Sequence, residues 1–208
     1  MNDQVFYTNA HYPRLARARG WYRHLLTKPR FQAIRRTGCV HSDLRVLEVG
    51  CDNGTLLRML ENTGAFGYGI DLNGDALRLT EHPRVTRGRA DALPFSDNAF
   101  DLCVASHVIE HLESPRRFLH ESSRVLSKRG KLILIYPWEL VRGITTIPDI
   151  VLSGQVPSLA LMRRIHRHCI TPARLRHFAH KTGLRHERST VFLGLPNLAV
   201  QILTVLAK

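Results

Sequence analysis

The sequence predicts an α/β protein in which a mostly parallel sheet carries helices on both faces. Short apolar runs typical of buried strands alternate with helical patterns, and a chain of 208 residues can build one domain with a sizeable core. Ser114-Pro115 is a helix start signal and Lys128-Arg129-Gly130 is a helix stop signal. We expect a basic helix at 13–37, strands at about 45–49, 66–70, 85–89, 100–105 and 131–136, and helices at about 54–62, 74–80 and 115–128.

The most informative element is the strand–turn–helix segment RVLEVGCDNG at residues 45–54. The strand breaks at Gly50, and Gly54 opens the helical pattern TLLRMLEN. Glycines let a ligand approach the backbone, and the unpaired N–H groups of a helix start point at it. Asp52 lies between the glycines, and no G-x-G-x-x-G pattern is present, so a ligand with a cationic end is favoured over a pyrophosphate. A purely structural corner is the alternative.

Further motifs follow at regular intervals. FGYGIDLN at 66–73 ends a second strand at Asp71, whose carboxylate can accept both hydroxyls of a ribose. The remaining motifs are RADALPF (89–95), FDLCVASHVIEHL (100–112) and GKLILIYP (130–137). In order and spacing, the five motifs resemble those of class I S-adenosylmethionine-dependent methyltransferases, most closely the broad methyltransferase type 11 group.

The resemblance covers about residues 43–137 and, more weakly, the segment ITPARLRHFAHKTGL at 170–184. It implies a Rossmann-like, seven-stranded methyltransferase sheet that is mostly parallel with an antiparallel C-terminal strand. We therefore expect one domain over 1–208. Its parts would be a basic N-terminal helical cap (1–42), a cofactor-binding core (43–137), a lid insertion (138–169) and a C-terminal helix and strand pair (170–208).

The resemblance also implies S-adenosylmethionine as the cofactor. Asp52 stands where the family usually has Gly, which leaves its contact open. Methyl transfer is an in-line displacement, so the protein mainly supplies alignment and desolvation, with a base if the acceptor must lose a proton. The resemblance implies that the methionine portion is bound by Glu48, Gly50, Cys51, Asp52 and Gly54. It also implies that the ribose is bound by Asp71, that the adenine is contacted by Leu72, Asp91 and Ala92, and that Ser106 lies beside the methyl donor.

His107 and His111 are the candidate catalytic residues. An imidazole over the methyl group could take a proton from an acceptor hydroxyl, and structural histidines in a cleft wall are the alternative. The same segment matches the zinc-binding pattern H-x-x-E-H. It begins at a strand end, and no downstream motif marks a third ligand, so we expect no metal.

Charge separates the core from the two ends of the chain. Residues 43–149 have a net charge of −2, whereas the rest of the chain has a net charge of +15. The basic residues concentrate at 14–36 and 163–185. In the resembled fold these segments flank the cofactor cleft, where a positive field would concentrate anionic substrates. A solvated basic exterior is the alternative.

The segment 138–162 is largely apolar and meets the basic run RRIHRH at 163–168. An apolar lid with a basic rim is typical of surfaces that lie on anionic membranes or receive amphiphilic molecules. We expect a small-molecule, lipid-like or carrier-linked acceptor, anionic in part, and peripheral contact with an anionic membrane. A lid that buries its apolar residues on the domain is the alternative.

Two further functions stay open. A nucleic-acid-binding or RNA-modifying methyltransferase would explain the basic ends, although no RNA-module motif is present. The second open function is a catalytically silent interaction module of the same fold. It is suggested by Asp52, which stands where the family usually has Gly, and by the lack of an assured catalytic base. The N-terminus lacks a signal segment and the four cysteines are scattered, so we expect a reduced, cytoplasmic location. The sequence does not fix whether O, N or C is methylated.

Overall fold

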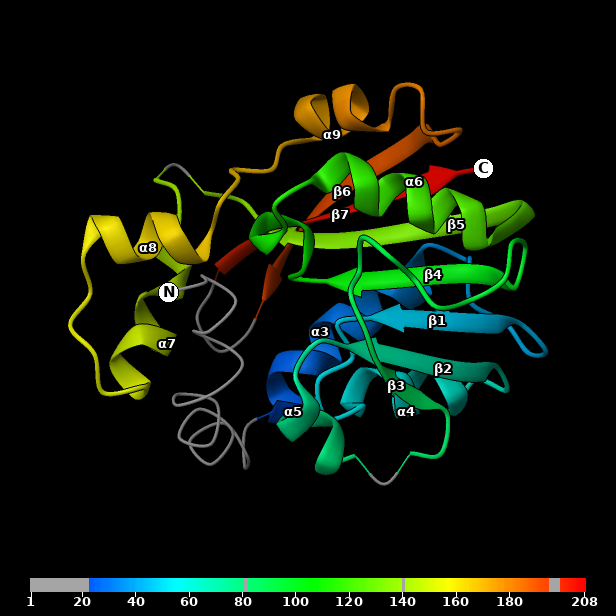
Figure 1. The fold of residues 1–208 in the computed structure, drawn as a ribbon, viewed down its shortest axis with the longest axis horizontal. Helices are drawn as coiled ribbons and strands as arrows, with labels where there is room; N and C mark the ends of the chain where they lie inside the picture. The colour runs from blue at the N-terminus through cyan, green and yellow to red at the C-terminus, as the bar shows by residue number, and fades with distance from the viewer. Residues whose placement is uncertain (1–22, 81, 140, 195–198) are drawn as a thin grey trace.

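The computed structural model describes residues 23–80, 82–139, 141–194 and 199–208. Its centre is a seven-stranded sheet with the order β3-β2-β1-β4-β5-β7-β6 (Figure 1). The first five strands in this order run parallel, and β7 is antiparallel to both of its neighbours. The predicted fold class is therefore confirmed. The strands are β1 (Arg45–Val49), β2 (Phe66–Asp71), β3 (Val85–Arg87), β4 (Phe100–Ser106), β5 (Leu126–Pro137), β6 (Arg185–Gly194) and β7 (Ala199–Ala207).

Helices cover both faces of the sheet, as Figure 1 shows. Alternate side chains of a strand point to opposite faces, so the strands bury two apolar sets. Leu47 packs in the same cluster as Phe118 of α6, whereas Val46 packs with Leu56 and Leu60 of α4. One face carries α6 (Pro115–Val125) and α9 (Pro172–Ala179), the other α3 (Arg23–Arg36) and α4 (Thr55–Glu61), and α5 (Gly74–Arg78) adjoins β2 and β3.

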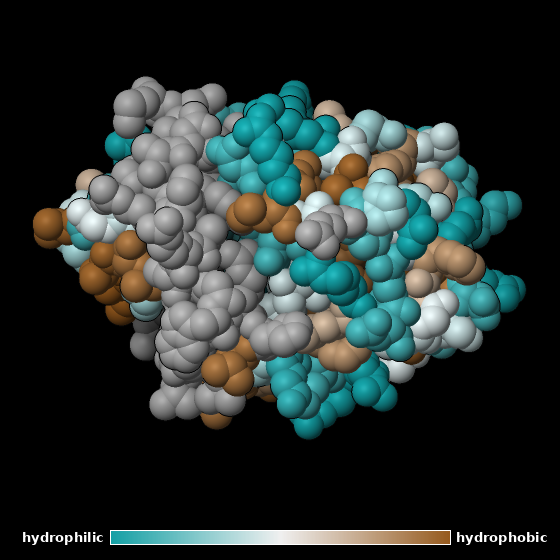
Figure 2. Space-filling model, turned by 90° about the horizontal axis from the view of Figure 1, so that it is seen from below, coloured by the Kyte–Doolittle hydropathy of each residue, from teal (hydrophilic) through white to brown (hydrophobic). Residues whose placement is uncertain are grey.

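The segment after β5, residues 138–169, is named the lid here and lies beyond the carboxyl ends of the parallel strands (left in Figure 1). It contains η2 (Ile144–Thr146), α7 (Ile147–Leu152) and α8 (Leu159–Ile165), which bury a small apolar cluster of their own. Figure 2 shows hydrophobic atoms gathered on this side of the molecule. The exposed apolar side chains of α7, α8 and the loop between them are Val151, Leu152, Val156 and Leu159.

One predicted boundary is wrong. The helix expected at 115–128 ends at Val125, and β5 begins at Leu126, five residues before the expected strand. Leu126 has an extended backbone (φ −74°, ψ 140°), is fully buried and pairs with Phe100. Burial and pairing of Leu126 thus outweigh the helix stop signal at Lys128–Gly130.

The expected basic helix at 13–37 falls partly outside the described residues, which begin at residue 23. Among the helices that the structure describes, none has the length and apolar character needed to cross a membrane.

Candidate active site

The turn after β1 has the close-packed backbone that its glycines predict. Gly50 (φ 76°) and Gly54 (φ 73°) both lie in the left-handed region, and a Cβ on Gly50 would collide with Val108. The N–H groups of Gly50 and Cys51 both donate to the carbonyl of Ile70, at 2.8 and 3.1 Å. The turn is thereby fixed against the end of β2, at the carboxyl edge of the sheet.

Three carboxylates converge on this turn. Glu48 is 3% exposed and its Oε2 has no hydrogen-bond partner among the described residues. Burial, and then the charges of Asp52 and Asp71, raise the pKa of Glu48 well above its usual range. The carboxylate of Asp71 accepts the N–H of Asp52 and the N–H of Asn73, both at 2.8 Å, yet burial raises its pKa too. A concentration of buried acid of this kind fits a ligand that brings positive charge.

The residues predicted to contact adenine lie on the loops after β2 and β3. The Leu72 carbonyl accepts from Arg87 at 3.1 Å. Asp91 forms a two-pronged contact with Arg89 at 2.8 and 2.9 Å, which lowers the pKa of Asp91. Ala92 is exposed. An adenine amino group would therefore share Asp91 with Arg89 rather than meet an unpaired carboxylate.

Ser106 and His107 end β4 at the same edge. The Ser106 hydroxyl is buried without a hydrogen-bond partner in the described part of the chain. His107 has a left-handed backbone (φ 56°), and its Nε2 lies 3.3 Å from Oε1 of Gln201 on β7. Burial, and then the charge of Arg30, lower the pKa of His107. The His107 ring thus has its Nε2 turned toward β7 and its Nδ1 toward Glu110.

His111 contacts the lid instead. Its Nδ1 lies 2.8 Å from the carbonyl of Ile165, and its ring packs edge-on against His166 with centroids 4.8 Å apart. Burial lowers the pKa of His111 to about 4, so the ring is neutral at neutral pH. The two predicted catalytic histidines therefore face different surroundings, although both adjoin η1 (Ile109–His111).

A buried acid–imidazole cluster, here Glu110, His111, Glu139 and His166, joins η1 to the lid. The Nδ1 of His166 lies 3.0 Å from each carboxylate oxygen of Glu139. Glu110 is 1% exposed; burial opposes its charge, but His107 and the other nearby imidazoles hold its pKa at about 2. Sequence analysis did not single out Glu110, Glu139 or His166. The run HRH at 166–168 after an apolar lid was the one available signal.

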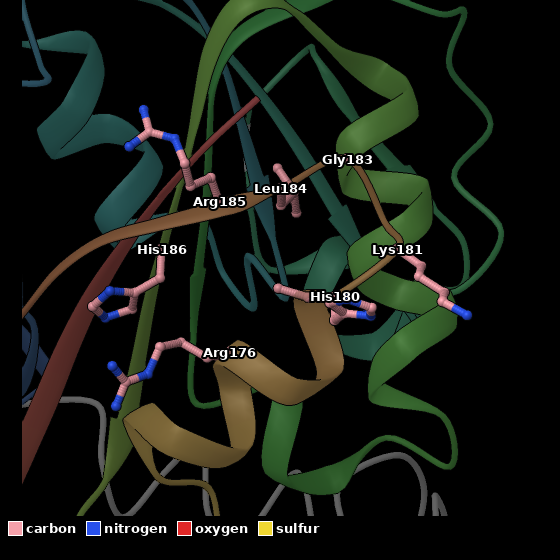
Figure 3. Close-up of a pocket in the computed structure, with 8 residues that line it drawn as sticks. Arg176, His180, Lys181, Gly183, Leu184, Arg185 and His186 are labelled. Carbon is pink, nitrogen blue, oxygen red and sulfur yellow. The ribbon is translucent and has the colours of Figure 1, made fainter.

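Within the described residues, the two basic segments do not form one continuous rim. Arg163 and Arg164 are exposed on α8, beside the apolar lid. The end of the second segment lies elsewhere: β6 begins at the amino edge of the sheet, opposite the turn after β1, because Arg185 pairs with Ala207. Arg14, Arg17 and Arg19 lie outside the described residues. In Figure 3 a shallow hollow between α9 and β6 is lined by Arg176, His180, Lys181, Arg185 and His186 among others, with Lys181 extending away from the rest.

Comparison with known proteins identifies the core. Residues 47–134 match the family model described as a methyltransferase domain. An S-adenosylmethionine-dependent methyltransferase from Mesorhizobium loti superposes with a TM-score of 0.68 at 17% identity, covering 85% of this chain and 96% of that one. Residues 47–134 thus match a methyltransferase domain, and the fold is that of S-adenosylmethionine-dependent methyltransferases. The match and the fold imply S-adenosylmethionine as the cofactor.

Other similar proteins show the breadth of the class. The methyltransferase domain resembles a putative Haloferax volcanii methyltransferase solved in complex with the Trm112 methyltransferase activator, with a TM-score of 0.71, 18% identity and coverage of 93% and 96%. A demethylmenaquinone methyltransferase from Renibacterium salmoninarum is 31% identical over 94 residues, which cover 43% of this chain and 40% of that relative. The matches span about half or less of the curated relatives' length.

S-Adenosylmethionine fits the residues of the turn on physical grounds. Its sulfonium and ammonium groups are cations, and Glu48, Asp52 and Asp71 supply negative charge with one buried carboxylate oxygen left without a hydrogen bond. Gly50 has no side chain, and a Cβ at this position would occupy space against Val108 beside the turn. Each Asp71 oxygen accepts one N–H and retains a lone pair for a ribose hydroxyl.

Proposed function

We propose that this chain transfers a methyl group from S-adenosylmethionine to a small-molecule acceptor. The convergence of three carboxylates on a glycine turn, at the carboxyl edge of a parallel sheet, is the observation that supports this most directly. The turn would bind the methionine portion and Asp71 the ribose. The main contribution of the protein would be to hold donor and acceptor in line and to exclude water.

The acceptor would enter on the side of the molecule where η1 and the lid lie. His107 and His111 lie on this side, and their neutral rings are able to accept a proton from an acceptor hydroxyl. His111 has its Nδ1 engaged by Ile165, so its Nε2 would be the accepting atom. These assignments are proposals for a base, and an acceptor that loses no proton would not need one.

An amphiphilic, lipid-like or carrier-linked acceptor is supported by the lid surface. Val156 is 84% exposed and Leu159 is 55% exposed, and the exposed Arg163 and Arg164 follow on the same helix as Leu159. An apolar surface beside cationic groups suits the boundary of an anionic membrane, which we propose as the place of peripheral contact. The name of the Renibacterium relative points to a quinone acceptor in that protein.

Replacing the ribose-binding carboxylate tests the cofactor assignment. A charged hydrogen-bond pair is worth roughly 1.5–3 kcal/mol, so Asp71→Ala should weaken S-adenosylmethionine binding by about 10- to 150-fold. The matched control is Asp75→Ala, which removes a more exposed carboxylate on α5. Calorimetric titration of the three proteins gives the affinities. Equal affinity of Asp71→Ala and wild type, or no binding by wild type, would refute the assignment.

The lid surface is tested by adding charge to it. The double variant Val156→Asp, Leu159→Asp should lose binding to anionic phosphatidylserine vesicles by about 10-fold or more, because two exposed apolar side chains can no longer be buried in lipid. Val191→Asp, an equally exposed change on β6, is the control and should bind vesicles as wild type does. Sedimentation with vesicles is compared with RNA titration over a salt series.

The outcomes separate the two acceptor classes. Tight RNA binding that falls steeply with salt and ignores the lid changes would favour the nucleic-acid alternative. Vesicle binding that the double variant retains, or no vesicle binding by wild type, would contradict the lipid-side proposal. Neither result bears on S-adenosylmethionine binding, which the Asp71 experiment measures independently.

A further inference from the structure

The acid–imidazole cluster places metal-ligating atoms from distant segments close together. One ligand atom each from Glu110, His111 and His166 lies within 4.8 Å of the other two. Ligands on a tetrahedral zinc ion are about 3.3 Å apart, given zinc–nitrogen bonds of about 2.0–2.1 Å. The three side chains therefore need only a modest contraction to reach a common ion.

Glu110 lacks the hydrogen bonds that a buried carboxylate needs. Neither of its oxygens has a hydrogen-bond partner among the described residues, although both are buried. The Nδ1 of His107 lies 3.2 Å from Oε1 but outside hydrogen-bond geometry. An ionised carboxylate removed from water is costly unless a cation or several donors compensate it. A bound cation would supply that compensation directly.

Both histidines are oriented as metal ligands usually are. The Nδ1 of His111 faces the Ile165 carbonyl at 2.8 Å, and the Nδ1 of His166 faces the Glu139 carboxylate at 3.0 Å. Both partners are acceptors, so each Nδ1 carries the proton and each Nε2 carries a lone pair. A carbonyl or carboxylate that holds the remote ring nitrogen is the usual support of a metal-binding histidine.

Glu139 is itself held firmly. Its carboxylate accepts the Gly143 N–H at 3.0 Å, and the N–H and hydroxyl of Thr145 at 3.2 and 2.5 Å. The N–H of His168 also donates to the Glu110 carbonyl at 3.1 Å, which fixes the lid beside η1. The arrangement therefore has an inner set of three ligands and an outer acid that orients one of them.

We propose that Glu110, His111 and His166 bind a divalent transition-metal ion, with Zn²⁺ as the best match, and that this ion joins the lid to the core. Two imidazoles and one carboxylate suit zinc and similar metals, whereas Mg²⁺ and Ca²⁺ prefer oxygen ligands. Sequence analysis found no third ligand for the H-x-x-E-H segment and led us to expect no metal. The fold supplies His166 from the lid, 55 positions after His111.

Three protein ligands leave a coordination position open. With the ion bound, the Nε2 lone pair of His111 would coordinate it, which leaves His107 as the candidate base. In the proposed methyl transfer, an oxygen of the acceptor would occupy the open position, and the ion would then lower the pKa of the acceptor hydroxyl. This second role rests on the proposed function. Metal binding itself does not, so the two can fail separately.

Zinc titration of chelator-treated full-length protein tests the site. With a chromophoric chelator as competitor, wild type should bind one equivalent tightly, and its Tm should rise with zinc concentration. Glu110→Gln and His166→Ala should weaken binding by at least 100-fold, and Glu139→Gln by about 10- to 100-fold. His120→Ala, an exposed histidine on α6, should bind as wild type does.

Two results would overturn the proposal. One is the absence of a stoichiometric zinc equivalent in wild type. The other is affinity in Glu110→Gln and Glu139→Gln equal to that of His120→Ala, which would mark the binding as surface adsorption. Far-UV circular dichroism in chelator checks folding, and these two near-isosteric variants decide the outcome if His166→Ala does not fold. Calorimetry with S-adenosylmethionine on the same samples shows whether cofactor binding depends on the metal.

Discussion

Gly50→Ala is expected to weaken S-adenosylmethionine binding by about 100-fold or more and to destabilise the fold. The new Cβ would require a left-handed backbone, at a cost of about 1–2 kcal/mol, and would collide with the Val108 side chain, which adds about 1–3 kcal/mol. Relief of the collision shifts the turn whose N–H groups are held by the Ile70 carbonyl. A displacement of about 1 Å in a positioning element can cost 100-fold.

A second glycine, Gly38, allows the cost of the left-handed backbone to be separated from the cost of the collision with Val108. Gly38 has a similar φ of 71°, but a Cβ there would meet no atom within 4 Å, so Gly38→Ala should cost only about 1–2 kcal/mol and leave cofactor affinity unchanged. Adding Val108→Ala to Gly50→Ala should restore part of the stability and affinity. Urea unfolding and calorimetry measure both quantities. Identical losses in the two single variants would show that the collision is unimportant.

The strand–turn–helix segment at 45–54 could be predicted because its determinants are local. Residues 45–54 specify a strand, a left-handed glycine and a helix start within ten positions, and the structure has β1, Gly50 and α4 at those places. The position of Asp71 at the end of β2 is predicted from a similar local pattern. The structure of such segments depends on backbone conformation and short-range pairing, and both can be inferred from the residues of the segment itself.

The acid–imidazole cluster could not be predicted, because its members meet only after the lid folds back. Glu110 and His166 are 56 positions apart, and their proximity depends on the packing of Ile150, Met162 and Ile165 within the lid. The expected flanking of the cleft by residues 163–185 does not hold for the end of that segment, for a similar reason. The direction of β6 places Arg185 at the opposite edge, and sheet topology determines that direction.

Glu48 makes stability and cofactor binding depend on pH in opposite ways. Burial, Asp52 and Asp71 raise its folded-state pKa, while the Leu57 N–H and Arg58 oppose the shift less strongly. Its contribution to stability is therefore fully present below the unfolded-state pKa of about 4.3 and is lost as pH rises through the folded-state pKa. A cationic ligand favours the ionised form, so binding should release a proton within that window.

Glu48→Gln should abolish this coupling. In wild type, release of one proton makes S-adenosylmethionine affinity rise by up to about tenfold per pH unit from about pH 4.3 to the folded-state pKa, whereas the variant should show a flat profile there. The variant should also gain stability relative to wild type as pH rises, because a neutral amide has no ionised form to keep out of the interior. Titrations in buffers of different ionisation enthalpy count the proton, and Asp97→Asn is the exposed control. Equal proton release by wild type and Glu48→Gln would show that another group near the turn is the one that titrates.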